Sequence, residues 1–241
     1  MLPGDFVESV LGQSRTEETV RIFRQELGLD KPYHVRYVNW LTSAIQGDLG
    51  STFSGRNATY ANQPQQNTAR SVSSLLQPRL FNTFFLAAMT AIIAIPLSLI
   101  LGITAALYRN SFYDRTVNAS ALTAISMPEF FVAYVLIIFL ASINQFFPSL
   151  SNVTSSTPFL ERVYLSILPA LTLTLVTVAH MMRMTRASII NLLSSPYIEM
   201  ARLKGMSRTK VIIKHALPNA WAPIANIIAF NLAYLIVGVV V

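Results

Sequence analysis

The amino-acid sequence predicts an all-α fold, a polytopic bundle of transmembrane helices. Of the 241 residues, 53% are hydrophobic and only 12% are charged, whereas about 25% of the residues of a soluble domain are charged. The apolar residues gather in four stretches, each long enough to cross a bilayer at about 20 residues per span. One soluble core of this length needs far less apolar surface, so a lipid bilayer is the expected solvent for much of the chain.

The four predicted spans are residues 83–107, 117–147, 164–182 and a stretch that begins near Asn219. The first has no charged residue, the second includes Pro128 and Glu129, and the third includes Pro169 and reaches His180. The fourth is still apolar at Val241. We expect this sequence, with its four spans, to be a fragment of a longer chain, because its polar start lacks an export signal and its apolar end has no polar flank.

The distribution of charge predicts the orientation of the spans. Residues 183–214 hold seven Lys or Arg and one acid, and the short loop 109–116 holds two Arg. Loops rich in Lys and Arg stay in the cytosol, so these two loops face inward. The loop 148–163 and the first 82 residues then face outward. The net charge of +7 therefore indicates topology, and no nucleic-acid partner is expected.

Two domains are predicted on this basis. Residues 1–82 form an extracytoplasmic segment, with a short amphipathic helix at 15–27 that Gly28 closes. Residues 54–74, rich in Ser, Asn, Gln and Thr, indicate a loop or a disordered insert. Residues 83–241 form the transmembrane domain, which includes the cytosolic loop 194–218.

The loop 194–218 predicts two short helices around a glycine. Ser195 can cap a helix that starts at Pro196, and Glu199 lies near its positive end. Gly205 is a natural left-handed stop. Ser207 can cap a second helix, whose apolar face is Val211, Ile212 and Ala216 and which Pro218 ends. Such a pair of short helices, held between two spans, is suited to be displaced as a rigid unit by a partner protein.

Two other interpretations of this loop remain open. It could be an ordinary positively charged loop that only fixes topology. The glycine turn and basic second helix also fit a DNA-binding helix-turn-helix loosely, but spans on both sides would hold it at the membrane surface, away from a major groove.

These residues resemble the cytosolic signature of the permease subunits of binding-protein-dependent ABC importers, which reads Glu-Ala-Ala, three residues, Gly, nine residues, Ile, one residue and Leu-Pro. Met200 and His215 depart from that general pattern. The His and an Asn-Ala after it are similar to the di- and oligopeptide (peptide/nickel/opine) branch. The matching positions are Tyr197, Glu199, Ala201, Arg202, Lys204, Gly205, His215, Leu217 and Pro218. Segments in the first 82 residues and in the first three spans also resemble that branch. The resemblance implies one more span before Met1 and one after Val241, which makes six in the full chain.

The resemblance implies a permease subunit in the bacterial cytoplasmic (inner) membrane that forms half of a translocation path for a di- or oligopeptide-type solute. Its implied partners are a second permease subunit, ABC ATPase subunits, an extracytoplasmic solute-binding protein and the lipid bilayer. The ATPase would push on the loop 196–217. The chain has no Gly-x-x-x-x-Gly-Lys-Ser/Thr phosphate loop, so we expect no enzyme activity and no bound cofactor, with ATP on the partner subunits.

Three further residues are candidates for the translocation path. They are Ser126, Glu129 and His180. A carboxylate within a span indicates function by default, but Glu129 after Pro128 could instead satisfy the N–H groups of a new half-helix. His180 could line the path or simply pack near the membrane boundary. With no Cys and scattered His, no metal site is expected.

Two rival functions are weighed against the importer. A gradient-driven secondary transporter or channel would favour more intramembrane ionisable groups or inverted repeats. A membrane-bound enzyme would need acids, His or a nucleophile clustered at the membrane face, where the loop 183–217 supplies mostly Arg and Lys.

Overall fold

A computed structural model describes residues 7, 17–26, 28–52 and 70–239 of the chain. The chain divides into two compact units, Met1–Arg79 and Leu80–Val241. The described residues are mostly helical, and the one β-type pairing among them is an isolated bridge between Ser51 and Ser71. The all-α prediction is therefore confirmed.

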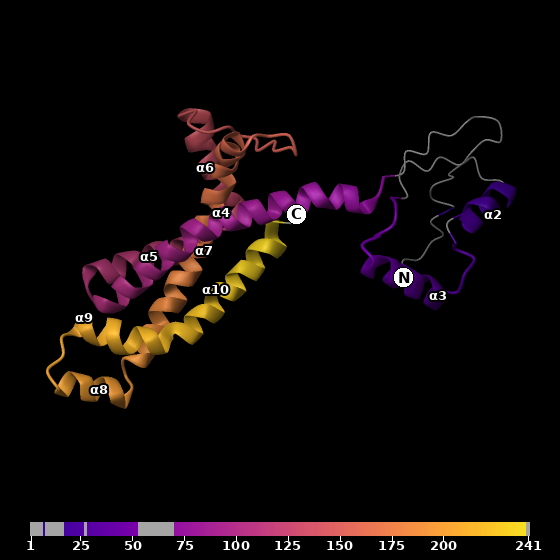
Figure 1. Cartoon of the computed structure of the whole chain (residues 1–241). Coiled ribbons are helices and arrows are strands. Elements are labelled where there is room, and N and C mark those ends of the chain that lie inside the picture. The colour runs from indigo at the N-terminus through magenta and orange to yellow at the C-terminus, as the bar shows by residue number, and fades with distance from the viewer. Residues whose placement is uncertain (1–6, 8–16, 27, 53–69, 240–241) are drawn as a thin grey trace. The chain divides into compact units, whose positions relative to one another are not determined.

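The first unit contains two short helices, α2 (Glu17–Glu26) and α3 (Tyr33–Ile45), drawn in indigo and violet in Figure 1. The predicted helix at 15–27 is confirmed over its described part, with Glu17 and Glu18 in its first turn. Gly28 has a φ of 61°. Its N–H donates to Gln25, and the next N–H donates to Arg24, which closes the helix as a glycine stop does. Helix α3 was not predicted.

A short set of hydrogen bonds ties the residues after α3 to the start of α4 (Val72–Leu107). The Val72 N–H donates to the Gly50 carbonyl at 2.9 Å, and the Ser73 hydroxyl donates to the Gly47 carbonyl at 3.3 Å. Residues 54–69 of the predicted insert lie outside the described residues. For residues 72–74 the prediction of a loop is wrong, because they already belong to α4.

Helix α4 contains the predicted first span and ends, as predicted, at Leu107. Its buried face repeats every three to four residues and consists of small side chains: Thr83, Ala87, Thr90, Ala94, Ser98, Gly102, Ala105 and Ala106. A Cβ on Gly102 would lie 2.9 Å from the backbone oxygen of Met182. Gly102 is therefore required for the close approach of α4 to α7 (Phe159–Leu192), as small residues allow in membrane helix packing.

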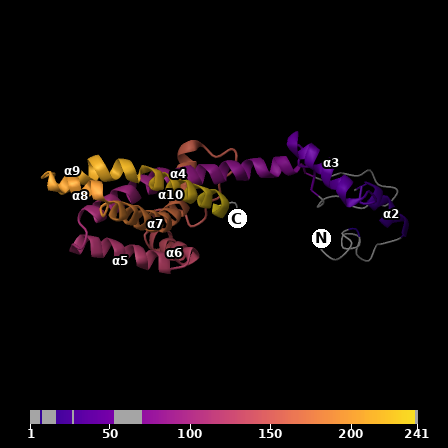
Figure 2. The same cartoon turned by 90° about the horizontal axis from the view of Figure 1, so that it is seen from below.

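The predicted second span is a broken helix. It consists of α5 (Phe112–Ser126), α6 (Glu129–Leu136) and the π-helical turn η2 (Ile137–Ile143), with a bend of 103° between α5 and the rest. Figure 2 shows that α5 lies alongside α7 and that α6 leaves the direction of α5 at the bend. The break at Pro128 was predicted. A proline lacks the N–H that would continue the helix and its ring clashes with the preceding turn.

The third and fourth spans are longer than predicted. Helix α7 contains Pro169 and continues to Leu192, ten residues beyond the predicted end. After α8 (Pro196–Leu203), a continuous helical stretch joins α9 (Arg208–Val211), the π-helical turn η3 (Ile212–Ala216) and α10 (Leu217–Val239). By length and composition, the described helices supply three membrane spans, or four if the bent pair counts as one.

Pro218 does not end the helix, so that prediction is wrong. The wider π-helical turn stands directly before it. Such a turn relieves the clash between the proline ring and the carbonyl four residues earlier, and π turns are common in helices that accommodate such defects. The second helix of the loop thus continues into the last span without a joint.

Hydrophobic and polar contacts show which helix ends lie together. Near the α8–α9 loop, one buried cluster joins α4, α7, η3 and α10 through Ala106, Ile189, Ile212, Ala220 and Ile224. At the opposite end, the buried Arg162 donates to the Asn82 side chain and to the Thr154 carbonyl, both at 2.8 Å. The loops 109–116 and 183–217 therefore share one end of the unit, and residues 153–154 lie at the other, as predicted.

Candidate functional site

Helix α8 starts and stops as the sequence predicts. Ser195 occupies the N-cap position, Pro196 is in the first turn and Glu199 follows within that turn. The Ser195 hydroxyl, however, donates to the carbonyl of Leu192 in α7 and does not cap the helix. The Ser195 side chain thus links the start of α8 to the last residue of α7.

The turn between α8 and α9 depends on Gly205. Its φ is 76°, a left-handed conformation that L side chains rarely adopt. The Gly205 N–H donates to the Arg202 carbonyl at 2.8 Å, and the Met206 N–H donates to the Ala201 carbonyl at 3.3 Å. This pair of bonds is the Schellman closure of a helix. Because a Cβ at Gly205 would meet nothing within 4 Å, the requirement for glycine is a backbone requirement.

The α8–α9 loop has a hydrophobic core of its own. The buried residues are Ile198, Ala201, Val211 and Ala216, with Leu193 and Met206 packed against them. The predicted apolar face of the second helix, Val211, Ile212 and Ala216, is buried throughout. Since this core joins α8 to the stretch that becomes α10, the loop can move as one body with the ends of α7 and α10.

The outer face of α8 points away from this core. Met200 and Leu203 are 56% and 76% exposed, and Tyr197 is partly exposed. Glu199, Arg202 and Lys204 are also exposed. A short helix that presents two large apolar side chains beside charged residues of both signs has the composition of a protein-binding surface.

Most of the other signature residues take internal positions in the loop. Ala201 belongs to the loop core, and Leu217 packs against the larger cluster at the end of α4 and α7. His215 is half-buried and its carbonyl accepts from the Asn219 side chain at 2.7 Å. Pro218 is exposed at the start of α10. Signature residues therefore divide into an outward set on α8 and an inward set that holds the loop together.

An ion pair braces the loop end of the unit. Asp114, which is 3% exposed, accepts from Arg186 Nε at 2.7 Å and from Arg186 Nη2 at 2.8 Å. The Asn110 N–H and the Asn118 side chain complete the shell around the carboxylate. A bidentate guanidinium–carboxylate pair of this kind fixes orientation as well as charge. It connects the first turn of α5 to α7, ten residues before α8 begins.

This brace was missed from the sequence. Arg186 lies in the basic stretch 183–214, which was interpreted only as a sign of topology, and Asp114 was not singled out. An acid in the first turn of a helix ordinarily interacts with the helix N-terminus, so nothing in the local sequence indicated a partner 72 residues away. The need for a partner comes from the burial of Asp114, and that burial arises only when the helices pack together.

The three path candidates have different surroundings. The Ser126 hydroxyl donates to the Leu122 carbonyl within its own helix. His180 is exposed on α7. Glu129 accepts a 2.6 Å hydrogen bond from the Tyr234 hydroxyl of α10, and no side-chain hydrogen bond caps the start of α6. Glu129 thus joins the bend to the last helix, a contact that neither interpretation from the sequence included.

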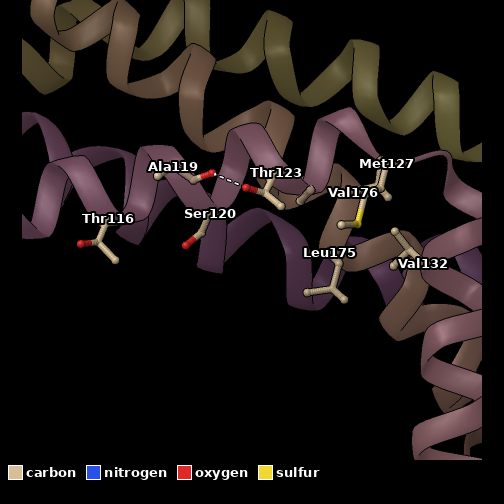
Figure 3. Close-up of a pocket in the computed structure, with 9 residues that line it drawn as sticks. Thr116, Ala119, Ser120, Thr123, Met127, Val132, Leu175 and Val176 are labelled. Atoms are coloured by element: carbon tan, nitrogen blue, oxygen red, sulfur yellow. Dashed lines mark hydrogen bonds between the residues drawn. The ribbon is translucent and has the colours of Figure 1, made fainter.

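An open pocket of about 600 Å³ lies beside the bend (Figure 3). Helix α5 contributes the hydroxyl-bearing residues Thr116, Ser120 and Thr123. The Thr123 hydroxyl donates a hydrogen bond to the Ala119 carbonyl at 3.0 Å. The remaining lining residues are mostly apolar: Ala119, Ala124, Met127, Val132, Leu175 and Val176. None of the three path candidates lines this pocket. Among the described residues, no three His, Cys, Asp or Glu side chains gather where they could hold a metal ion.

Comparison with known proteins places the chain among transport proteins. Residues 94–241 match the family described as binding-protein-dependent transport system inner membrane component. The glutathione transport system permease protein GsiC of Salmonella choleraesuis is 31% identical over 241 residues, all of this chain and 72% of the relative. A probable peptide ABC transporter permease protein of Sinorhizobium fredii is 32% identical with the same coverage.

A putative peptide transport system permease protein of Brucella abortus is 34% identical over 245 aligned residues, which cover all of this chain and 73% of the relative. The agreement runs over the full chain and includes the spans and the α8–α9 loop, as the resemblance in the sequence implied. The chain therefore belongs to the inner-membrane components of binding-protein-dependent transport systems, and it is a multi-pass membrane permease subunit.

Proposed function

We propose that this permease subunit forms half of the path of an ATP-driven importer for di- or oligopeptide-type solutes, and that α8 receives the motion of an ABC ATPase subunit. The observation that supports the proposal is the division of the α8–α9 loop into a packed inner core and an exposed outer face. A push on Met200 or Leu203 reaches α7 and α10 together, because the core holds the loop to both.

The substrate class rests on the relatives, which are named for glutathione and for peptides. The assembly would need a second permease subunit to complete the path, ATPase subunits that bind and hydrolyse ATP, and a solute-binding protein on the outer side. In this proposal the chain binds no cofactor and catalyses no reaction. Ser126, Glu129 and His180 remain candidate residues of the path.

The brace gives the push a route into the bent span. Movement of α8 displaces the end of α7, and Arg186 then carries α5 with it through Asp114. Because α5 ends at the bend and beside the open pocket, a rigid displacement of α5 would change the opening at that point. Such rigid-body shifts of packed helices are a common switching mechanism.

Charge reversal on α8 tests the proposal. Glu199→Lys in the reconstituted transporter should reduce ATP-driven peptide uptake, because the surface that meets the ATPase changes sign while the loop core stays intact. Glu161→Lys is the matched control, since Glu161 is also an exposed acid in the first turn of a helix, at the other end of α7. Equal uptake by the two variants and the parent chain would show that Glu199 has no part in coupling.

Uptake assays in the same vesicles distinguish the importer from a gradient-driven transporter. Uptake by the parent chain should require ATP on the side of the membrane where the ATPase subunits lie, and it should persist when ionophores collapse the ion gradients. Uptake without ATP that disappears with the gradient would favour a secondary transporter.

A further inference from the structure

Helix α3 presents an aromatic face that no described residue of its own unit covers. The helix has no buried residue among its thirteen. Tyr33, Tyr37, Trp40 and Leu41 follow one another at spacings of four, three and one residues and are all exposed. At 100° per residue these positions share one face. Asn39 and Thr42 lie roughly opposite, beside Val35 and Val38, and Arg36 and Ser43 lie at the edge of the aromatic face.

The chemistry of this face fits the boundary between lipid headgroups and acyl chains. Tyr and Trp are enriched at that boundary, where one end of the side chain is apolar and the other is wet. Helix α3 carries no acid, so no side chain on it would be repelled by lipid phosphates, and Arg36 stacks over the Tyr33 ring at 4.8 Å. Amphipathic helices of this kind lie in the membrane surface with the apolar face submerged.

The start of α4 holds α3 close to the membrane. Gly47, two residues after the end of α3, accepts from Ser73 in the first turn of α4, and Gly50 accepts from Val72. From Val72 to Arg79, the last charge before the apolar span, the helix rises by about 10 Å at 1.5 Å per residue. Headgroups occupy about 5–8 Å on each side of the hydrocarbon core. The end of α3 is therefore tethered at about headgroup height.

We propose that the Tyr33–Tyr37–Trp40–Leu41 face of α3 lies in the headgroup–acyl boundary of the leaflet in which α4 begins. The helix is then a membrane-surface anchor that fixes the first unit beside the start of the span. This inference concerns the position of the first unit and is independent of which solute the transporter carries.

Spin labels on the two faces of α3 test this anchor. The chain has no cysteine, so single cysteines can be placed at Leu41 or Tyr37 on the apolar face and at Asn39 or Thr42 on the polar face. The assembled transporter, with cysteine-free partner subunits, is studied in lipid vesicles. Collision of each label with oxygen, which enters the bilayer, is compared with collision with a water-soluble nickel chelate.

The oxygen-to-nickel collision ratio should be several-fold higher at Leu41→Cys and Tyr37→Cys than at Asn39→Cys and Thr42→Cys. Adding the solute-binding protein should leave all four ratios unchanged. Equal ratios on the two faces would refute the anchor. Shielding of the apolar face only when the binding protein is present would also refute it and would assign the face to that protein. Two sites per face keep the result independent of one poorly tolerated substitution.

Discussion

The two ends of the second unit are built in different ways. At the loop end, apolar side chains from α4, α7, η3 and α10 pack with almost no exposure, and the Asp114–Arg186 pair joins α5 to them. At the other end, α6 has no buried residue, and Glu129 and Tyr234 meet by one exposed hydrogen bond. Under the proposed mechanism, a force applied at the loop end would therefore pass to α5, α7 and α10 together.

The comparison also shows how each end deals with charge. Asp114 and Arg186 satisfy one another with two hydrogen bonds, and Asn110 and Asn118 add two more. At the far end, no acid among the described residues pairs with Arg162, which is held by a side-chain oxygen, a carbonyl and the ring of Phe81 at 4.8 Å. The first arrangement locks two helices together, whereas the second fastens a loop to the start of α4.

Removing the brace should have the largest effect. Arg186→Ala leaves the buried Asp114 carboxylate with two of its four donors, and hydrogen bonds to charged groups contribute about 1.5–3 kcal/mol. We expect about 2–3 kcal/mol of lost stability and a strong loss of coupled uptake. Thermal unfolding in detergent and uptake in vesicles measure the two effects.

A double-mutant cycle provides the control for the brace. In Asp114→Ala/Arg186→Ala the unpaired buried charge is gone, so the double variant should be less destabilised than the sum of the single variants. Strictly additive effects would mean that the two residues act independently and that the brace does not exist as a unit.

The glycine of the loop turn should have an intermediate effect. Gly205→Val forces a β-branched side chain into a left-handed conformation, at a cost of about 1–2 kcal/mol, and should weaken coupling of ATP hydrolysis to uptake. Gly205→Asn is the matched variant, because Asn tolerates that conformation and the surrounding space is open. Full uptake by the Val variant, or equal loss in both, would contradict the backbone role of Gly205.

The contact at the far end should matter least for stability. Tyr234→Phe removes one exposed hydrogen bond to Glu129 and nothing else, so the change in unfolding free energy should be at most about 1 kcal/mol. A shift in melting temperature as large as that of Arg186→Ala would show that the far end is as firmly braced as the loop end.

Local signals predicted much of this molecule. Unbroken apolar stretches predicted the spans, and Pro128 and Gly205 predicted the bend and the turn because proline and glycine act on their own backbone. Glu199 and its neighbours on α8 were predicted as the coupling face. Their exposure agrees with that role, and their contact with an ATPase stays a prediction.

Other features depend on packing between distant segments. Asp114 meets Arg186 across 72 residues, and Glu129 meets Tyr234 across 105. Neither pairing has a sequence period or spacing from which it could be predicted. Pro218 led to a wrong prediction of a helix end, because the π-helical turn before it accommodates the proline and the helix continues. Helix α3 could have been recognised from Tyr33, Tyr37 and Trp40, whose spacing is that of a helix face.

The most direct test of the coupling role measures protection of α8 by the ATPase. Leu203→Cys places the chain's single thiol on the exposed face, and Ser156→Cys places it in an exposed loop at the opposite end. Both should react with a maleimide in the permease alone in detergent. Adding the ATPase subunits should slow the reaction at Leu203→Cys strongly and leave that at Ser156→Cys unchanged. Equal reactivity at Leu203→Cys with and without the ATPase would contradict the assignment of α8 as the surface that the ATPase holds.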